Sequence, residues 1–163
     1  MTALWFSARY PDRVGRAVFA NTAARIGTVE MWNARIDAVR TGGMGAIRDT
    51  SLARFFSEGF RRSHPEVVQR FGEMLEAINP LGYMEACTAL RDADLHDILS
   101  AIHVPSLILA GELDPATPPS QSRELHSAIP GSELVIFPEV AHLSNVEQPE
   151  EFSKSVLDFL SVH

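Results

Sequence analysis

The chain has 163 residues, of which 45% are hydrophobic and 21% are charged, and its net charge is −7. This balance is ordinary for a globular domain, and the acidic charge argues against a surface for nucleic acid or for an anionic membrane. No apolar run approaches the ~20 residues of a membrane span, and no signal peptide is evident. Because the one cysteine, Cys87, cannot form an internal disulfide, we expect a reducing, cytoplasmic compartment.

The first two predicted elements are a helix and a strand. Residues 1–10 carry apolar side chains at helical spacing, and Pro11 follows them. Residues 15–21 form a short apolar run that ends in polar residues, which predicts a buried strand.

The segment from residue 27 to residue 93 has a different character. Its apolar residues recur mostly at intervals of three and four, which is typical of helices, and it shows no strand pattern. We expect four helical segments, separated by breaks at residues 41–43, 57–65 and 79–80. The segment is therefore predicted to be an all-helical insertion.

The last third of the chain alternates helices with strands, which favours an α/β arrangement. A short helix with Asp94 as its N-cap is expected over residues 94–102, and a buried strand runs from Val104 to Ala110. The remaining expected elements are a helix over 119–128, a strand over 134–137, and a helix over 149–160 with Phe152, Val156, Phe159 and Leu160 on its inner face.

Two candidate catalytic residues follow the last two strands. Asp114 lies just past the first of them, and His142 lies just past the second. Reacting groups in open parallel sheets gather at the carboxyl ends of the strands. A carboxylate bound to one imidazole nitrogen fixes the tautomer, so the other nitrogen can accept a proton from a nucleophile. Either residue alone could be a turn-capping acid or a plain loop histidine, but their joint placement favours a catalytic pair.

Five stretches of the sequence carry a family resemblance: YPDRV, RAVFANTAARIGT, EMWNARIDAVRTGGM, GELDPATPP and AHLSNVEQPEEF. Together, over the whole chain, they resemble the 3-oxoadipate enol-lactonases of the α/β-hydrolase superfamily. The resemblance implies hydrolysis of a small lactone in the protocatechuate (β-ketoadipate) pathway by a serine–histidine–aspartate triad. Carried over by position, Asp114 is the triad acid and His142 is the general base.

One part of the family pattern is missing from this chain. The nucleophilic serine of the family lies in a G-x-S-x-G elbow before the helix that precedes YPDRV, but here that helix begins at Met1 and no G-x-S-x-G occurs elsewhere. We therefore expect the C-terminal part of an α/β-hydrolase fold, with three parallel strands, flanking helices and an all-helical cap. The predicted division is a partial core over residues 1–26, a cap over 27–93 and the C-terminal part of the core over 94–163.

This incomplete sheet has an expected consequence for stability. The strand near residues 16–20 would present an unpaired edge and an uncovered face, and such surfaces invite association. The chain is therefore expected to be marginally stable, oligomeric, or dependent on a complementing N-terminal segment.

The substrate implied by the resemblance carries a free carboxylate, so a site that selects it needs a cation. Arg25 follows a strand end and Arg35 lies about one helical turn after Trp32, so either could bind the carboxylate, or each could be a solvated arginine. Trp32 is a candidate pocket wall or a packing residue between cap and core. Leu143 and Met31 are candidates for apolar lining.

No cofactor is expected, and the histidines show no spacing typical of metal ligands. The expected partner is a small lactone or ester that carries a carboxylate. Two alternatives stay open. One is a different α/β hydrolase, such as a carboxylesterase, a C–C bond hydrolase or a dehalogenase, and the other is a non-catalytic truncated or complementing chain.

Overall fold

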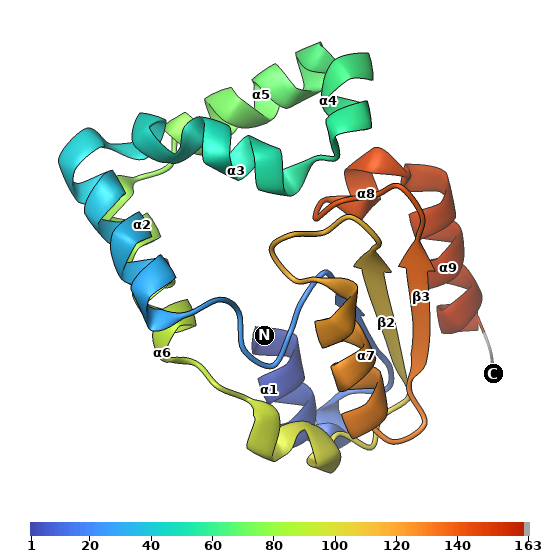
Figure 1. Ribbon diagram of the computed structural model, residues 1–163. Coiled ribbons are helices and arrows are strands. Elements are labelled where there is room, and N and C mark those ends of the chain that lie inside the picture. Colours follow the sequence, from blue (N-terminus) through green and yellow to red (C-terminus); the bar gives the residue numbers. More distant parts are fainter. Residues whose placement is uncertain (162–163) are drawn as a thin grey trace.

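The structure, a computed structural model, describes residues 1–161 and contains a three-stranded sheet from which a helical lobe projects (Figure 1). The strands are β1 (Ala17–Ala20), β2 (Ser106–Gly111) and β3 (Glu133–Phe137). They run parallel in the order β1-β2-β3, with Ala17 opposite Ser106 and Leu107 opposite Glu133. The predicted parallel arrangement is confirmed.

Helices cover both faces of this sheet (Figure 1). The elements of this core are α1 (Thr2–Arg9), η1 (Pro11–Arg13), η3 (His96–Ala101), α7 (Pro119–Ala128), α8 (Ser144–Glu147) and α9 (Pro149–Ser161), where η marks a 3-10 helix. On one face, Ile108 packs with Leu4, Leu99 and Leu125 from α1, η3 and α7. On the other face, Leu107 and Leu109 pack with Phe159 of α9. Every residue of β2 is buried, so the central strand anchors both layers.

Several predicted boundaries in the core were wrong by a few residues. The strand predicted from Val104 begins at Ser106, because Pro105 has no N–H to donate to a sheet ladder. The helix predicted over residues 94–102 is the shorter η3, and Asp94 lies ahead of it, where its carboxylate accepts the N–H of His96 at 3.1 Å. Leu160 is 47% exposed, so its predicted inward position was wrong. It lies about 100° around the helix from the buried Phe159.

The helical lobe comprises residues 29–92, and none of its residues forms a strand. Its elements are α2 (Val29–Gly42), η2 (Met44–Ile47), α3 (Arg48–Phe55), α4 (Glu58–Ser63), α5 (Pro65–Glu76) and α6 (Pro80–Asp92). The lobe has its own apolar core, in which Val39 packs with Met44 and Leu75 while Trp32 packs with Cys87. In Figure 1, α2 and α6 rise from the sheet, and α4 returns toward α8 on the far side.

The break predicted over residues 57–65 was wrong, because it contains α4. Ser57 is the N-cap of this helix, and its hydroxyl accepts the N–H of Phe60 at 3.2 Å. Pro65 is the first residue of α5, where a missing N–H costs nothing. The same serine and proline that suggest a loop are thus start signals for two successive helices. No helix in residues 1–161 is long and apolar enough to cross a membrane.

Candidate active site

The ends of all three strands meet at one buried carboxylate. Asn21 directly follows β1, Asp114 follows β2, and His142 follows β3. The imidazole Nδ1 of His142 lies 2.8 Å from Oδ2 of Asp114, and the amide of Asn21 donates to the same oxygen at 3.2 Å. The Asp114 side chain is fully buried, whereas that of His142 is 23% exposed. The fold therefore brings the predicted acid and the predicted base into direct contact.

The loop after β2 holds the Asp114 carboxylate from its own backbone. Its Oδ1 accepts the N–H groups of Ala116 at 2.8 Å and Thr117 at 3.0 Å, and its Oδ2 accepts the hydroxyl of Thr117 at 2.8 Å. Burial pushes the pKa of Asp114 upward, but His142 and Thr117 outweigh it and hold this pKa below its ordinary value. The carboxylate is thus kept ionised and oriented toward His142.

Gly111 allows the loops that carry Asp114 and His142 to approach one another. A Cβ atom at this position would lie 2.1 Å from the carbonyl oxygen of Ala141 and 2.4 Å from that of Val140. In this close packing, the N–H of Leu113 donates to the carbonyl of Val140 at 2.8 Å. Any larger residue would force the two loops apart, and the Asp114–His142 hydrogen bond depends on their separation.

His142 lines a cavity of about 160 Å³ between the strand ends and the helical lobe. The lobe contributes side chains from α2, α3 and α6, and the full lining is Asn21, Ile26, Trp32, Arg35, Ser51, Arg54, Phe55, Tyr83, Leu90, Ala116 and His142. The Phe55 ring stacks on the imidazole at a centroid distance of 6.2 Å. Because Nδ1 is engaged by Asp114, Nε2 is the nitrogen that remains to accept a proton.

Two arginines in this cavity have no acidic partner: in residues 1–161, no carboxylate forms an ion pair with Arg35 or Arg54. Arg35 donates from Nε to the Tyr83 hydroxyl at 2.6 Å and from Nη2 to Ser51 Oγ at 2.5 Å, so its position is braced. Burial and the nearby charge of Arg35 lower the pKa of Arg54, although Asp114 and Tyr83 oppose the shift. Paired, partly buried guanidinium groups of this kind suit a bound anion.

The sequence-predicted binding residues fall into two groups. Trp32 and Arg35 line the cavity together with His142, and the indole N–H of Trp32 donates to the carbonyl of Ile26 at 2.6 Å. Arg25 and Leu143 do not line it. The Arg25 side chain is 46% exposed and pairs with Asp94 at 3.5 Å on the surface, away from the cavity. The prediction that Arg25 serves as a pocket cation is therefore not supported.

Leu143 and Met31 act at the margins of the site. Leu143 is half-buried, and its backbone N–H donates to the carbonyl of Phe55 at 2.9 Å, so it links the His142 loop to α3. Met31 lies against Arg54, whose Nη1 is 3.7 Å from the Met31 sulfur. Neither side chain lines the cavity that His142 faces.

Arg54, Asn21 and Tyr83 also belong to the site and were not predicted from the sequence. Asn21 could have been found, because it directly follows a predicted strand, as Asp114 and His142 do, and its φ of 45° lies in a region that asparagine tolerates. Arg54 and Tyr83 carry no such signal, since they lie on helices with other charged and apolar residues and reach the cavity only through the packing of α3 and α6.

Comparison with known proteins identifies the family. The family model described as the alpha/beta hydrolase fold matches residues 1–149. The chain belongs to this family. It is 36% identical to 3-oxoadipate enol-lactonase 2 of Acinetobacter baylyi over 156 residues, which cover 96% of this chain and 58% of that enzyme. It is 34% identical to 3-oxoadipate enol-lactonase 1 of the same organism over 152 residues, or 93% of this chain and 57% of that enzyme.

The solved structures agree with this α/β-hydrolase assignment. The crystal structure of the enol-lactonase from Burkholderia xenovorans LB400 superposes with a TM-score of 0.96 at 37% identity, covering 99% of this chain and 62% of that one. The predicted fold class and the predicted family resemblance are therefore confirmed. The chain spans less than two thirds of the length of these relatives.

The lowered pKa of Asp114 predicts how stability depends on pH. A carboxyl whose pKa is depressed by folding contributes fully above its ordinary value of 3.8 and loses that contribution as the pH falls through the lower, folded value. Asp114→Asn should therefore destabilise the protein by about 1–3 kcal/mol at pH 7 and flatten the loss of stability below pH of about 4. Urea unfolding measured from pH 3 to pH 7 checks this.

The matched control for that experiment is Asp97→Asn, which removes an exposed carboxyl from η3. It should leave both the stability at pH 7 and its acid dependence close to those of the unmodified protein. An acid dependence that is the same in Asp114→Asn as in the unmodified protein would contradict the assignment.

Proposed function

We propose that this chain carries the acid, the general base and the carboxylate-binding pocket of a hydrolase that acts on ester or lactone bonds. The proposed substrate is 3-oxoadipate enol-lactone, in the protocatechuate (β-ketoadipate) pathway. One observation carries the proposal: the Asp114–His142 pair opens onto the cavity in which Arg35 and Arg54 lie without an acidic partner. The similarity to two 3-oxoadipate enol-lactonases supports the choice of substrate.

The proposed chemistry follows from the hydrogen bonds of His142. Asp114 keeps the proton on Nδ1 and stabilises the imidazolium that forms when Nε2 takes a proton from the attacking nucleophile. The nucleophile adds to the lactone carbonyl, and His142 returns the proton to the leaving enolate oxygen as the ring C–O bond breaks. His142 then takes a proton from water, which attacks the carbonyl of the acyl-enzyme. The acyl bond breaks, His142 returns the proton to the nucleophile, and the free acid leaves.

The nucleophile is the missing component of this mechanism. In residues 1–161, no serine hydroxyl is hydrogen-bonded to Nε2 of His142. Ser51 lines the cavity, but its hydroxyl donates to the carbonyl of Ile47 at 2.6 Å and accepts from Arg35. The Ser144 hydroxyl donates to Asn21 at 2.5 Å. We propose that a complementing segment, added at the free edge of β1, supplies the serine and the oxyanion-binding groups.

The two arginines distinguish this proposal from a general carboxylesterase. A substrate with a free carboxylate gains charge-assisted hydrogen bonds from Arg35 and Arg54, whereas a neutral ester leaves two partly buried cations without an anionic partner. A carboxylate held there would orient the lactone carbonyl toward His142, since both side chains line the same cavity.

Removal of the general base tests the reaction. Hydrolysis of 3-oxoadipate enol-lactone should fall by about 100-fold or more in His142→Ala, because general-base catalysis contributes roughly 10²–10⁴ in rate. Activity is measured with the purified protein, alone and with a complementing N-terminal segment from an enol-lactonase. The control is His103→Ala, which removes an exposed histidine beyond η3. Turnover that survives His142→Ala would contradict the assigned role, and binding of 3-oxoadipate without any turnover would support the non-catalytic alternative.

Removal of the pocket cations tests the substrate class. Arg35→Met and Arg54→Met should each weaken binding of 3-oxoadipate by about 10–100-fold, which corresponds to one charge-assisted hydrogen bond. Isothermal titration of the protein with 3-oxoadipate measures this change. Arg25→Met is the matched control, because it deletes the same charge outside the cavity. Equal affinity in all three variants would contradict a carboxylate site and favour a neutral ester.

The edge of the sheet tests the proposed complementation. In the part of the chain that the structure describes, β1 pairs only with β2. The N–H groups of Ala17 and Asn21 donate to β2, so by alternation the N–H of Val18 points to the free edge. Val18→Pro should therefore reduce self-association, or binding of an N-terminal segment, without removing a bond to β2. Sedimentation measures this, and a monomeric, cooperatively melting protein that binds no segment would contradict the proposal.

A further inference from the structure

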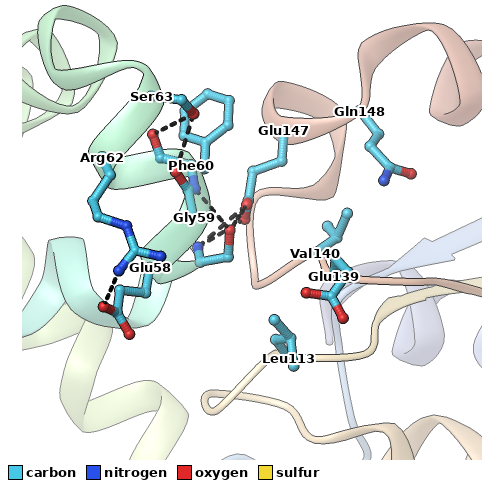
Figure 2. Close-up of a pocket in the computed structure, with 11 residues that line it drawn as sticks. Glu58, Gly59, Phe60, Arg62, Ser63, Leu113, Glu139, Val140, Glu147 and Gln148 are labelled. Atoms are coloured by element: carbon cyan, nitrogen blue, oxygen red, sulfur yellow. Dashed lines mark hydrogen bonds and ion pairs between the residues drawn. The ribbon is translucent and has the colours of Figure 1, made fainter.

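A single carboxylate joins the helical lobe to the loop that carries His142. Oε1 of Glu147, in α8, accepts the N–H of Ala141 at 2.9 Å. The same carboxylate accepts the N–H of Ser57 at 3.2 Å, and Oε2 accepts the Ser57 hydroxyl at 2.5 Å. Figure 2 shows the Glu147 side chain directed from the core toward the start of α4, beside Glu58 and Gly59. Glu147 thus binds the lobe and the residue before His142 simultaneously.

The other side of His142 is held from the same part of the lobe. The N–H of Leu143 donates to the carbonyl of Phe55 at 2.9 Å, and the Phe55 ring stacks on the imidazole. The backbone N–H groups of both neighbours of His142, Ala141 and Leu143, are therefore tied to residues 55–57 of the lobe, one through Glu147 and one directly.

Glu147 lies in a groove that is separate from the cavity of His142. A groove of about 460 Å³ runs between α4 and the loops after β2 and β3, and Glu147 is part of its wall (Figure 2). Glu147 does not line the separate cavity that contains His142, so its carboxylate is not placed to touch a substrate there. Its effect on the reaction has to act through the backbone at Ala141.

The chemistry of the three donors explains why a side chain with an acceptor oxygen is needed. Two backbone N–H groups and one hydroxyl all point at the Glu147 side chain, and an ionised carboxylate is a pure acceptor with two oxygens. Glutamine at this position keeps one acceptor oxygen, which can serve Ala141 and Ser57 N–H together, and alanine keeps none.

We propose that Glu147 is a positioning residue for His142. Through Glu147, the position of the lobe sets the orientation of the imidazole. The catalytic part of this inference rests on the proposed hydrolase function. The structural part, that the lobe and the His142 loop are coupled through Glu147, does not. Displacement of residues 55–57 would release the N–H groups of Ala141 and Leu143, the two neighbours of His142, so the base is correctly placed only when the lobe is seated.

The test uses Glu147→Ala and Glu147→Gln in the purified protein, with Glu150→Ala as the control. Glu150 is an exposed acid in the first turn of α9, close to Glu147 in sequence but outside these contacts. NMR hydrogen exchange should show lost protection at the amides of Ala141 and Ser57 in Glu147→Ala, and the ¹⁵N resonances of the His142 ring should shift. The glutamine variant should retain most of both properties, and the Glu150→Ala control should retain all of them.

The kinetic readout separates positioning from binding. In the presence of the complementing N-terminal segment, Glu147→Ala should lower kcat for the lactone by about 10–100-fold with little change in KM, because misplacement of the base by about 1 Å costs this much in rate while the arginines are untouched. Rescue by glutamine is expected in the same assay.

Two results would overturn the inference. One is unchanged exchange at Ala141 and Ser57 in Glu147→Ala, and the other is an unchanged His142 spectrum in that variant. If Glu147→Ala does not fold, Ser57→Ala removes the hydroxyl donor to Glu147 together with the N-cap bond to Phe60, and keeps the Ser57 N–H. It should give a smaller change of the same kind at Ala141 and His142, and no change there would also overturn the inference. If the unmodified protein hydrolyses no lactone even with the complementing N-terminal segment, the proposed function fails, while exchange and the His142 spectrum still decide the coupling.

Discussion

The buried carboxylate of Asp114 is the interaction on which the site depends. A buried charge is costly unless it is paired and hydrogen-bonded, and here Asn21, Ala116, Thr117 and His142 all donate to it. These donors come from the ends of β1, β2 and β3, so the requirement to satisfy one carboxylate draws three loops together. Gly111 makes that convergence sterically possible, because it lets the backbone of the His142 loop lie against the end of β2.

The helical lobe completes the site from the opposite side. It contributes Trp32, Arg35, Arg54 and Tyr83 to the cavity, and none of these belongs to the sheet. The strand ends hold the acid and the base, and the lobe holds the cations. The lobe also contacts the His142 loop through Phe55 and through the Ser57–Glu147 hydrogen bond. The lobe that carries the cavity arginines is therefore also bound to the loop that carries His142.

The patterns that succeeded were periodic or positional. The buried run that became β2 and the helix over residues 119–128 were predictable because apolar period and flanking prolines are local signals. Where two signals conflicted, prediction failed. Ser57 and Pro65 mark loops as readily as helix starts, so α4 was missed, and Leu160 extends an apolar pattern but lies too far around α9 to be buried.

Local sequence was sufficient for the alternation of helices and strands in the core, for the family resemblance and for the pairing of Asp114 with His142, because each depends on patterns among residues that are neighbours in the chain. The cation site was not accessible in this way. Arg25 and Arg35 looked equivalent in the sequence, but the packing of α2 on α6 turns Arg35 into the cavity beside Arg54 and Tyr83, while Arg25 lies at the surface with Asp94. Burial and distance between helices distinguish the two arginines, and both are properties of the packed chain.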